Sequence, residues 1–102
     1  MVVSVASGCE LALEGRLDVH SVSEVRTALH AAIDAGGGDL MVDVSGVELV
    51  DVTGLGVLVG ADRRAKLAGR RVVLHHASPR LLRILRATGL HRVLTVATEV
   101  PA

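Results

Sequence analysis

A short apolar segment near the middle of the chain limits the possible folds most strongly. Residues 40–44 read Leu-Met-Val-Asp-Val, which is apolar enough for an interior strand buried on both faces. Segments with apolar residues at helical spacing precede and follow it. Strands that alternate with helices are typical of an α/β domain whose central strands run mainly parallel. We therefore expect an α/β fold.

The segments on either side complete this pattern. Residues 2–6 and 9–13 are expected to form a hairpin around Ser7 and Gly8. A turn is expected over residues 45–52. The other predicted elements are a helix between Ser21 and Gly36, a helix over residues 54–68, a strand over 70–74, a helix between Ser78 and Gly89, a strand over 93–96 and a frayed end over 98–102.

Helix boundaries carry recognisable signals. Ser21 and Glu24 have capping-box spacing, and Ser78 followed by Pro79 is typical of a capped helix start. Three glycines from Gly36 are expected to end the first helix with a left-handed residue. The residues expected to face the core are Val22, Val25, Leu29, Ala32 and Ile33 in the first helix, Leu55, Leu58, Ala61, Ala65 and Ala68 in the second, and Leu81, Leu82 and Leu85 in the third.

Composition bounds the classes of protein that remain. The chain has 102 residues, enough for a single domain over residues 1–102 that buries a core without metal or disulfides. Half of the residues are hydrophobic and none is aromatic, so the core must be aliphatic. Stacking platforms for single-stranded nucleic acid are therefore missing. Cys9 is the only cysteine, which favours a reducing compartment. With no signal peptide or membrane span in the sequence, we expect a cytoplasmic protein.

The turn before the second helix combines residue types that suit a functional site. Asp51, Val52 and Thr53 precede Gly54-Leu55-Gly56, so we expect Thr53 to be the N-cap of the helix. A helix start is favourable for an anion, because first-turn amides are unpaired and the dipole is positive there. By itself this pattern predicts a capped helix and nothing more.

Three segments together resemble the STAS domain, and within it the anti-sigma factor antagonists of bacteria. The segments are Gly15-Arg16-Leu17-Asp18, residues 43–58, and residues 69–74 followed by Ser78-Pro79 and Thr88-Gly89-Leu90. The resemblance runs from about Val5 to Val96. It implies a mixed, mainly parallel sheet of four to five strands with helices wound against it.

The resemblance also implies a site and partners. In that family a kinase phosphorylates the hydroxyl at the position of Thr53. The family usually has a second serine just before it, and this chain has Val52 at that position. The implied partners are an anti-sigma factor that is also a serine/threonine kinase, and a phosphatase. The unphosphorylated form would bind the anti-sigma factor and release the sigma factor. The residues expected to contact the partner are Asp18, Asp51, Val52, Gly54, Leu55 and Gly56. The alternative is a STAS subunit of a lipid-transport or stress-signalling assembly that is not phosphorylated.

No pattern for catalysis, a metal or a cofactor emerges, so we expect none of the three. There is no HExxH, no G-x-S-x-G and no phosphate-binding loop. His75 and His76 are adjacent on an expected strand end, where neighbouring side chains point to opposite faces, so they should not share a metal.

Charge is segregated although the formal net charge is zero. Ten of the eleven acidic residues fall within residues 1–62, and nine of the eleven basic residues within 63–102. Two solvated faces that compensate one another explain this, and we expect Arg80, Arg83 and Arg86 to lie on one of them. A nucleic acid or an anionic membrane bound by the basic half is the competing interpretation. We expect neither.

Overall fold

The computed structural model describes residues 2–7 and 9–97. Within them the elements follow the order β1 (Val2–Ser7), β2 (Glu10–Leu17), α1 (Val22–Ala35), β3 (Asp39–Val50), α2 (Val52–Leu67), β4 (Arg71–His75), α3 (Pro79–Thr88), the 3₁₀ helix η1 (Leu90–Arg92) and β5 (Thr95–Val96). No helix in this part of the chain has both the length and the apolar character to cross a bilayer.

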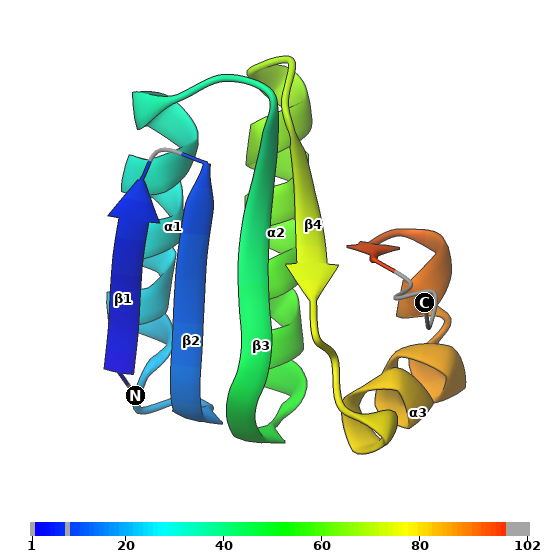
Figure 1. The fold of residues 1–102 in the computed structure, drawn as a ribbon. Helices are drawn as coiled ribbons and strands as arrows, with labels where there is room; N and C mark the ends of the chain where they lie inside the picture. Colours follow the sequence, from blue (N-terminus) through cyan, green and yellow to red (C-terminus); the bar gives the residue numbers. More distant parts are fainter. Residues whose placement is uncertain (1, 8, 98–102) are drawn as a thin grey trace, which may run out of the picture.

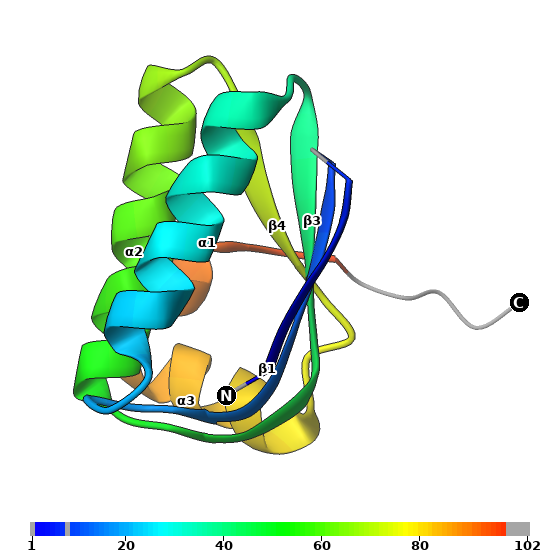
Figure 2. The same cartoon turned by 90° about the vertical axis from the view of Figure 1, so that its left-hand side faces the viewer.

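The strands form one sheet in the order β1-β2-β3-β4-β5 (Figure 1). β1 runs antiparallel to β2, and the other neighbours are parallel. Figure 2 shows α1 and α2 side by side on one face of the sheet, with α3 near the ends of β3 and β4. This arrangement confirms the α/β fold with a mixed, mainly parallel sheet and helices wound against it.

Burial on β3 follows the two faces of the sheet. Leu40, Val42 and Val44 are buried in the core beneath α1 and α2. Met41 and Asp43 alternate with them and are only half-buried. The prediction that residues 40–44 are buried on both faces is therefore wrong, because no described helix covers the second face (Figure 2). The core is aliphatic, as expected.

The strand ends extend further than the sequence indicated. The prediction of a turn over residues 45–52 is wrong for residues 45–50, which continue β3, and for Val52, where α2 begins two residues earlier than predicted. β2 continues as well, and its last pair with β3 is Leu17 with Val50. The added ladder satisfies backbone groups that a long turn would leave open. The predicted hairpin of β1 and β2 is confirmed, while Gly8 and residues 98–102 lie outside the described residues.

The start of α1 differs from its predicted capping box. Ser21 is the N-cap, but its side chain accepts no hydrogen bond from the helix. The hydroxyl instead donates to the Arg16 carbonyl at 2.7 Å and accepts from the Asp18 amide at 3.1 Å. The capping box of Ser21 and Glu24 is therefore wrong, because the preceding loop uses the hydroxyl. The five core residues predicted for α1 are all buried.

A buried arginine explains how α1 ends. The C-cap Gly36 is extended, and Gly38 is the left-handed residue that was predicted among the three glycines. Arg70 is only 5% exposed and donates to the carbonyls of Ala32 and Ile33 at 2.8 Å each. Carbonyls in the last turn have no partner within a helix, so the guanidinium supplies the missing donors.

The boundaries of α2 and α3 test the other predictions. Ser78 accepts from the Leu81 amide at 3.0 Å, and left-handed Gly89 ends α3, both as predicted. In α2, four of the five predicted core residues are buried, but Ala68 is an exposed C-cap. In α3, Leu82 is half-buried where Leu81 and Leu85 are buried. The predicted last strand shortens to Thr95–Val96 because η1 precedes it.

The two adjacent histidines lie against each other. His76 has a positive φ of 58°, and its ring centroid lies 4.0 Å from that of His75 in an edge-on contact. The expected opposite orientation is therefore wrong, because the left-handed residue breaks the strand alternation.

The Asp43 carboxyl lies near these histidines. The pKa of Asp43 is lowered, mainly because the Ser45 amide donates a hydrogen bond to this carboxyl at 2.9 Å. Among the described residues no group of three or more possible ligands could hold a metal.

Ion pairs join the acidic and basic halves of the chain. Asp34 on α1 pairs with Arg64 on α2 at 2.7 Å, and the hydrogen bond from Arg64 lowers the pKa of Asp34. Asp39 on β3 pairs with Arg71 on β4 at 2.8 Å, and Arg71 lowers the Asp39 pKa in the same way. The segregated charges thus partly neutralise one another across neighbouring elements.

Asp62 gives a first testable prediction. It is 2% exposed, and its Oδ2 lies 2.9 Å from Lys66 Nζ, while its Oδ1 is buried with no partner in the described residues. An unsatisfied buried acceptor costs about 1–3 kcal/mol, whereas a pair with a largely exposed lysine contributes at most about 1 kcal/mol. Asp62→Leu is therefore expected to raise the free energy of unfolding by about 1 kcal/mol in urea denaturation.

Asp34→Leu is the control, because that carboxylate forms an exposed pair with Arg64 and leaves no buried oxygen unpaired. It should bring no gain in stability. A loss of stability in Asp62→Leu larger than that in Asp34→Leu would show that the Asp62 carboxylate is fully compensated in the folded protein.

Candidate functional site

The ends of β2 and β3 bring two loops together at the start of α2. Leu17 and Val50 are the last paired residues of these parallel strands. The Asp51 amide then donates to the Leu17 carbonyl at 3.2 Å, so the chain turns into α2 directly beside the end of β2. Carboxyl ends of parallel strands share one edge of a sheet, and the loops that follow them meet there.

Asp51, and not Thr53, is the N-cap of α2. Asp51 is extended, and its Oδ1 accepts from the Gly54 amide at 2.8 Å. Thr53 is the second residue of the helix. The predicted cap at Thr53 is therefore wrong, because the carboxylate two positions earlier reaches the third helical amide first. Thr53 is left on the outside of the first turn.

The Asp51 side chain also ties the two loops together. Its second oxygen, Oδ2, accepts from the Val19 amide at 3.3 Å. Asp18 has a local role, since its Oδ1 accepts from the His20 amide at 3.0 Å and its carbonyl accepts from the amides of Ser21 and Val22. The loops bearing Asp18 and Asp51 are thus adjacent, and both carboxylates accept backbone hydrogen bonds.

The predicted site residues divide by exposure. Thr53, Val52 and Gly56 are exposed, with Val52 at 84%, and Asp18 and Asp51 are half-buried. Leu55 is 7% exposed within the core cluster, and Gly54 is buried. Within the described part of the chain, the structure gives the Thr53 hydroxyl no hydrogen-bond partner. The side chains that reach the surface at this turn are therefore those of Asp18, Asp51, Val52 and Thr53.

Gly54 is buried because α2 approaches β2 very closely. A Cβ at this position would lie 2.2 Å from the Leu17 carbonyl oxygen. Gly56 has no neighbour within 4 Å of such an atom. The first glycine therefore serves the packing of the helix start, and the second leaves open space beside Thr53.

Two exposed apolar residues near this turn were missed from the sequence. Val19 follows Asp18 and is 61% exposed, and Leu49 lies at the end of β3 and is 42% exposed. They flank Asp51 together with Val52. Val19 lies outside every predicted helix or strand, and Leu49 lies in the predicted turn over residues 45–52. The sequence pattern therefore did not indicate whether either side chain is buried or exposed. A strand prediction extended to residue 50 would have given Leu49 a face.

The electrostatics of the turn combine opposite influences. The amides of Val52 and Thr53 lie ahead of the first intrahelical hydrogen bond, so the positive end of the α2 dipole lies at Thr53. The carboxylates of Asp18 and Asp51 bring negative charge close to the same point. The positive end of the helix dipole and the two carboxylates thus act in opposite directions on the neutral Thr53 hydroxyl. An anion added at Thr53 would make the surface of this turn much more negative.

Comparison with known proteins identifies the family. The family model described as "Mlab, STAS domain" matches residues 1–96. The chain belongs to the STAS domain family. Among curated relatives it is 32% identical over 87 residues to an anti-sigma-B factor antagonist of Bacillus subtilis (strain 168), covering 85% of this chain and 79% of that protein. It is 30% identical over 91 residues to an anti-sigma F factor antagonist of Lysinibacillus sphaericus, covering 88% of this chain and 78% of that protein.

Solved structures show the same fold. The anti-sigma factor antagonist SpoIIAA in its unphosphorylated form superposes with a TM-score of 0.74 at 23% identity, covering 96% of this chain and 88% of that one. A variant of RsbS from Moorella thermoacetica, with glutamate in place of a serine, superposes with a TM-score of 0.71 at 31% identity, covering 89% of this chain and 79% of that one.

Proposed function

We propose that this chain is an anti-sigma factor antagonist that phosphorylation of Thr53 switches off. The names of its relatives support the first part of the proposal. The exposed Thr53 hydroxyl on the first turn of α2 supports the second, and it is the observation that carries it. In the unphosphorylated state the protein binds an anti-sigma factor, which thereby releases its sigma factor. The anti-sigma factor is also the kinase, and a phosphatase resets the switch.

The surface that meets the anti-sigma factor would be the turn between β3 and α2 with the neighbouring loop after β2. Val52, Val19 and Leu49 offer apolar contact area, and Asp18 and Asp51 offer charge. Leu55 and Gly54 support this surface from beneath, since both are buried. Exposed apolar side chains suit the desolvated core of a protein interface, and charged groups beside them suit its polar rim.

Phosphate at Thr53 would change the charge of this surface without unfolding it. A phosphoryl group adds close to two negative charges, and the positive end of the α2 dipole tolerates them. Asp51 and Asp18 lie nearby, so the modified surface would become strongly negative. A partner surface that fits a neutral hydroxyl then loses affinity, and a desolvated charge mismatch of about 3 kcal/mol corresponds to more than a hundredfold.

Thr53→Glu tests the switch. We expect it to weaken binding of the anti-sigma factor at least about tenfold while changing the free energy of unfolding by no more than about 1 kcal/mol, because a carboxylate suits a helix start. Thr53→Ala should bind but resist phosphorylation. The partner is obtained by affinity capture from the source cell, titrated by calorimetry, and then incubated with the protein and ATP before the phosphopeptide is mapped.

Thr27→Glu is the matched control, because Thr27 is an exposed threonine on a different helix, α1. It should leave the affinity unchanged. Phosphate found only at another residue would contradict the assignment of Thr53. Equal binding by wild type and Thr53→Glu, with no phosphate at Thr53, would instead favour a subunit of a lipid-transport or stress-signalling assembly that is not phosphorylated.

A further inference from the structure

A cavity of about 450 Å³ lies between the end of β4, helix α3 and the segment that follows η1. It is remote in sequence from the Thr53 turn and shares no residue with it. Its volume falls within the range of sites for small organic molecules. It also lies beyond the carboxyl end of a parallel strand, where open α/β sheets commonly bind ligands.

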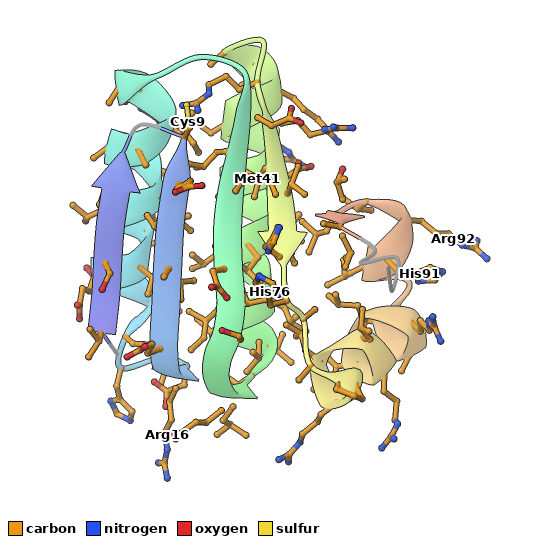
Figure 3. The ribbon with its side chains drawn as sticks, viewed as in Figure 1. Cys9, Arg16, Met41, His76, His91 and Arg92 are labelled. Atoms are coloured by element: carbon orange, nitrogen blue, oxygen red, sulfur yellow. The ribbon has the colours of Figure 1, made fainter. Side chains whose placement is uncertain are left out.

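Three basic side chains from three different segments line the cavity. His76 follows β4, Arg86 belongs to α3 and His91 belongs to η1. In Figure 3 His76 comes from the β4 side and His91 from the η1 side. None of the described residues that line the cavity is acidic. Arg86 therefore carries the formal charge among the described residues that line the cavity, and the two imidazoles add ring nitrogens that can form hydrogen bonds.

Backbone geometry and hydrogen bonding fix two of these side chains. His76 is the only described residue other than glycine with a positive φ, a conformation that is uncommon and concentrated at functional sites. His91 donates from Nδ1 to the Leu85 carbonyl at 3.3 Å, which orients the ring. Its Nε2 accepts a hydrogen bond in the neutral ring and donates to an anion when the ring is protonated. Arg86 adds a guanidinium that is charged at all relevant pH values and suits planar oxyanions.

The rest of the lining is apolar. Leu82, Val96 and two alanines, Ala77 and Ala97, form the remaining wall. Leu82 lines the cavity, and it is therefore only half-buried, whereas Leu81 and Leu85 of the same helix are buried in the core. A bare inorganic ion would leave this wall unused, whereas a ligand with an apolar body would cover it.

We propose that this cavity binds a small organic anion, with a phosphate or carboxylate group held by Arg86, His76 and His91 and an apolar body against Leu82 and Val96. The site is separate from the Thr53 switch. It requires neither a kinase nor an anti-sigma factor.

The test is a titration of the ¹⁵N-labelled full-length chain, followed by NMR chemical shifts. Phenyl phosphate and benzoate are the two anionic probes, and benzyl alcohol is the neutral probe of similar shape. We expect saturable binding of both anions in the millimolar range, with shifts gathered at residues 76–77, 82–86 and 91–97. Benzyl alcohol should bind at least about tenfold more weakly. The ratio of the two anionic affinities distinguishes phosphate from carboxylate ligands.

Arg86→Gln and Arg83→Gln form a matched pair, because both arginines are exposed on α3 and only Arg86 lines this cavity. Arg86→Gln should weaken phenyl phosphate binding at least about fivefold, and Arg83→Gln less than about twofold. The inference is overturned by the absence of saturable binding, by shifts centred on the start of α2, or by equal effects of the two variants. None of these outcomes decides whether Thr53 is phosphorylated, so the two proposals fail independently.

Discussion

Arg70→Met is expected to lower the free energy of unfolding by about 3–5 kcal/mol. The Arg70 guanidinium donates to the carbonyls of Ala32 and Ile33 at 2.8 Å and to the carbonyl of Gly38 at 2.9 Å. Methionine would fill much of the volume but donate nothing. The buried carbonyls at the end of α1 would then lack partners, and each would cost about 1–3 kcal/mol.

Arg71→Met provides the control, since Arg71 is the next residue and forms an exposed pair with Asp39. It should cost no more than about 1 kcal/mol. Arg70→Lys should fall between the two, because an ammonium group donates from a single point and cannot span carbonyls that the guanidinium fork reaches together. Urea unfolding measures the free energy of unfolding of the three variants and of wild type. Equal losses for Arg70→Met and Arg71→Met would show that the end of α1 depends on other contacts.

Arg70 also illustrates what sequence patterns cannot reveal. Periodicity identified α1 with all five of its core residues, because a helix that packs on a sheet must place apolar residues on one stripe. It treated Arg70 as one charge in the basic half. The role of this arginine depends on four carbonyls more than 30 residues away, at residues 32, 33, 37 and 38. No local pattern encodes such a contact.

The cap of α2 shows a second kind of limit. Asp51 and Thr53 are both good N-cap residues, so the sequence offers two helix starts that differ by two residues. The structure selects Asp51 because its other carboxyl oxygen accepts from Val19 in a different loop. By contrast, Ser78, Pro79 and Gly89 were placed correctly, because the signals at both ends of α3 are local and do not compete.

The adjacency of the Asp18 and Asp51 loops could be predicted, whereas the exposure of their neighbours could not. Parallel strands next to each other in a sheet bring their following loops to one edge, so the pairing of β2 with β3 is enough to place these two loops together. The exposure of Val19 and Leu49 depends on where β2 and β3 end. Both strands end later than the sequence indicated, at Leu17 and Val50. Val19 and Leu49 therefore join the candidate partner surface only through the structure, whereas Val52 was predicted from the sequence.

Gly54→Ala is expected to lower the free energy of unfolding by about 3 kcal/mol or more, because the new Cβ would lie 2.2 Å from the Leu17 carbonyl oxygen. The obstacle is a backbone atom held in the sheet, so a side-chain rotation cannot relieve it. The start of α2 would have to move away from β2, stretching the bonds from the Asp51 carboxylate to Val19 and Gly54. Both loops of the candidate partner surface would shift with it.

Gly56→Ala, two residues further along the same helix, separates this clash from the general effect of adding a methyl group. A Cβ at residue 56 meets nothing within 4 Å, so alanine should stabilise the helix by about 0.5–1 kcal/mol. Thermal unfolding gives the two stabilities, and hydrogen exchange at the Val19 amide reports whether the loops separate. We expect faster exchange in Gly54→Ala alone. If both variants are as stable as wild type, α2 has room to move, and the close approach of Gly54 to Leu17 does not hold the two loops of the site together.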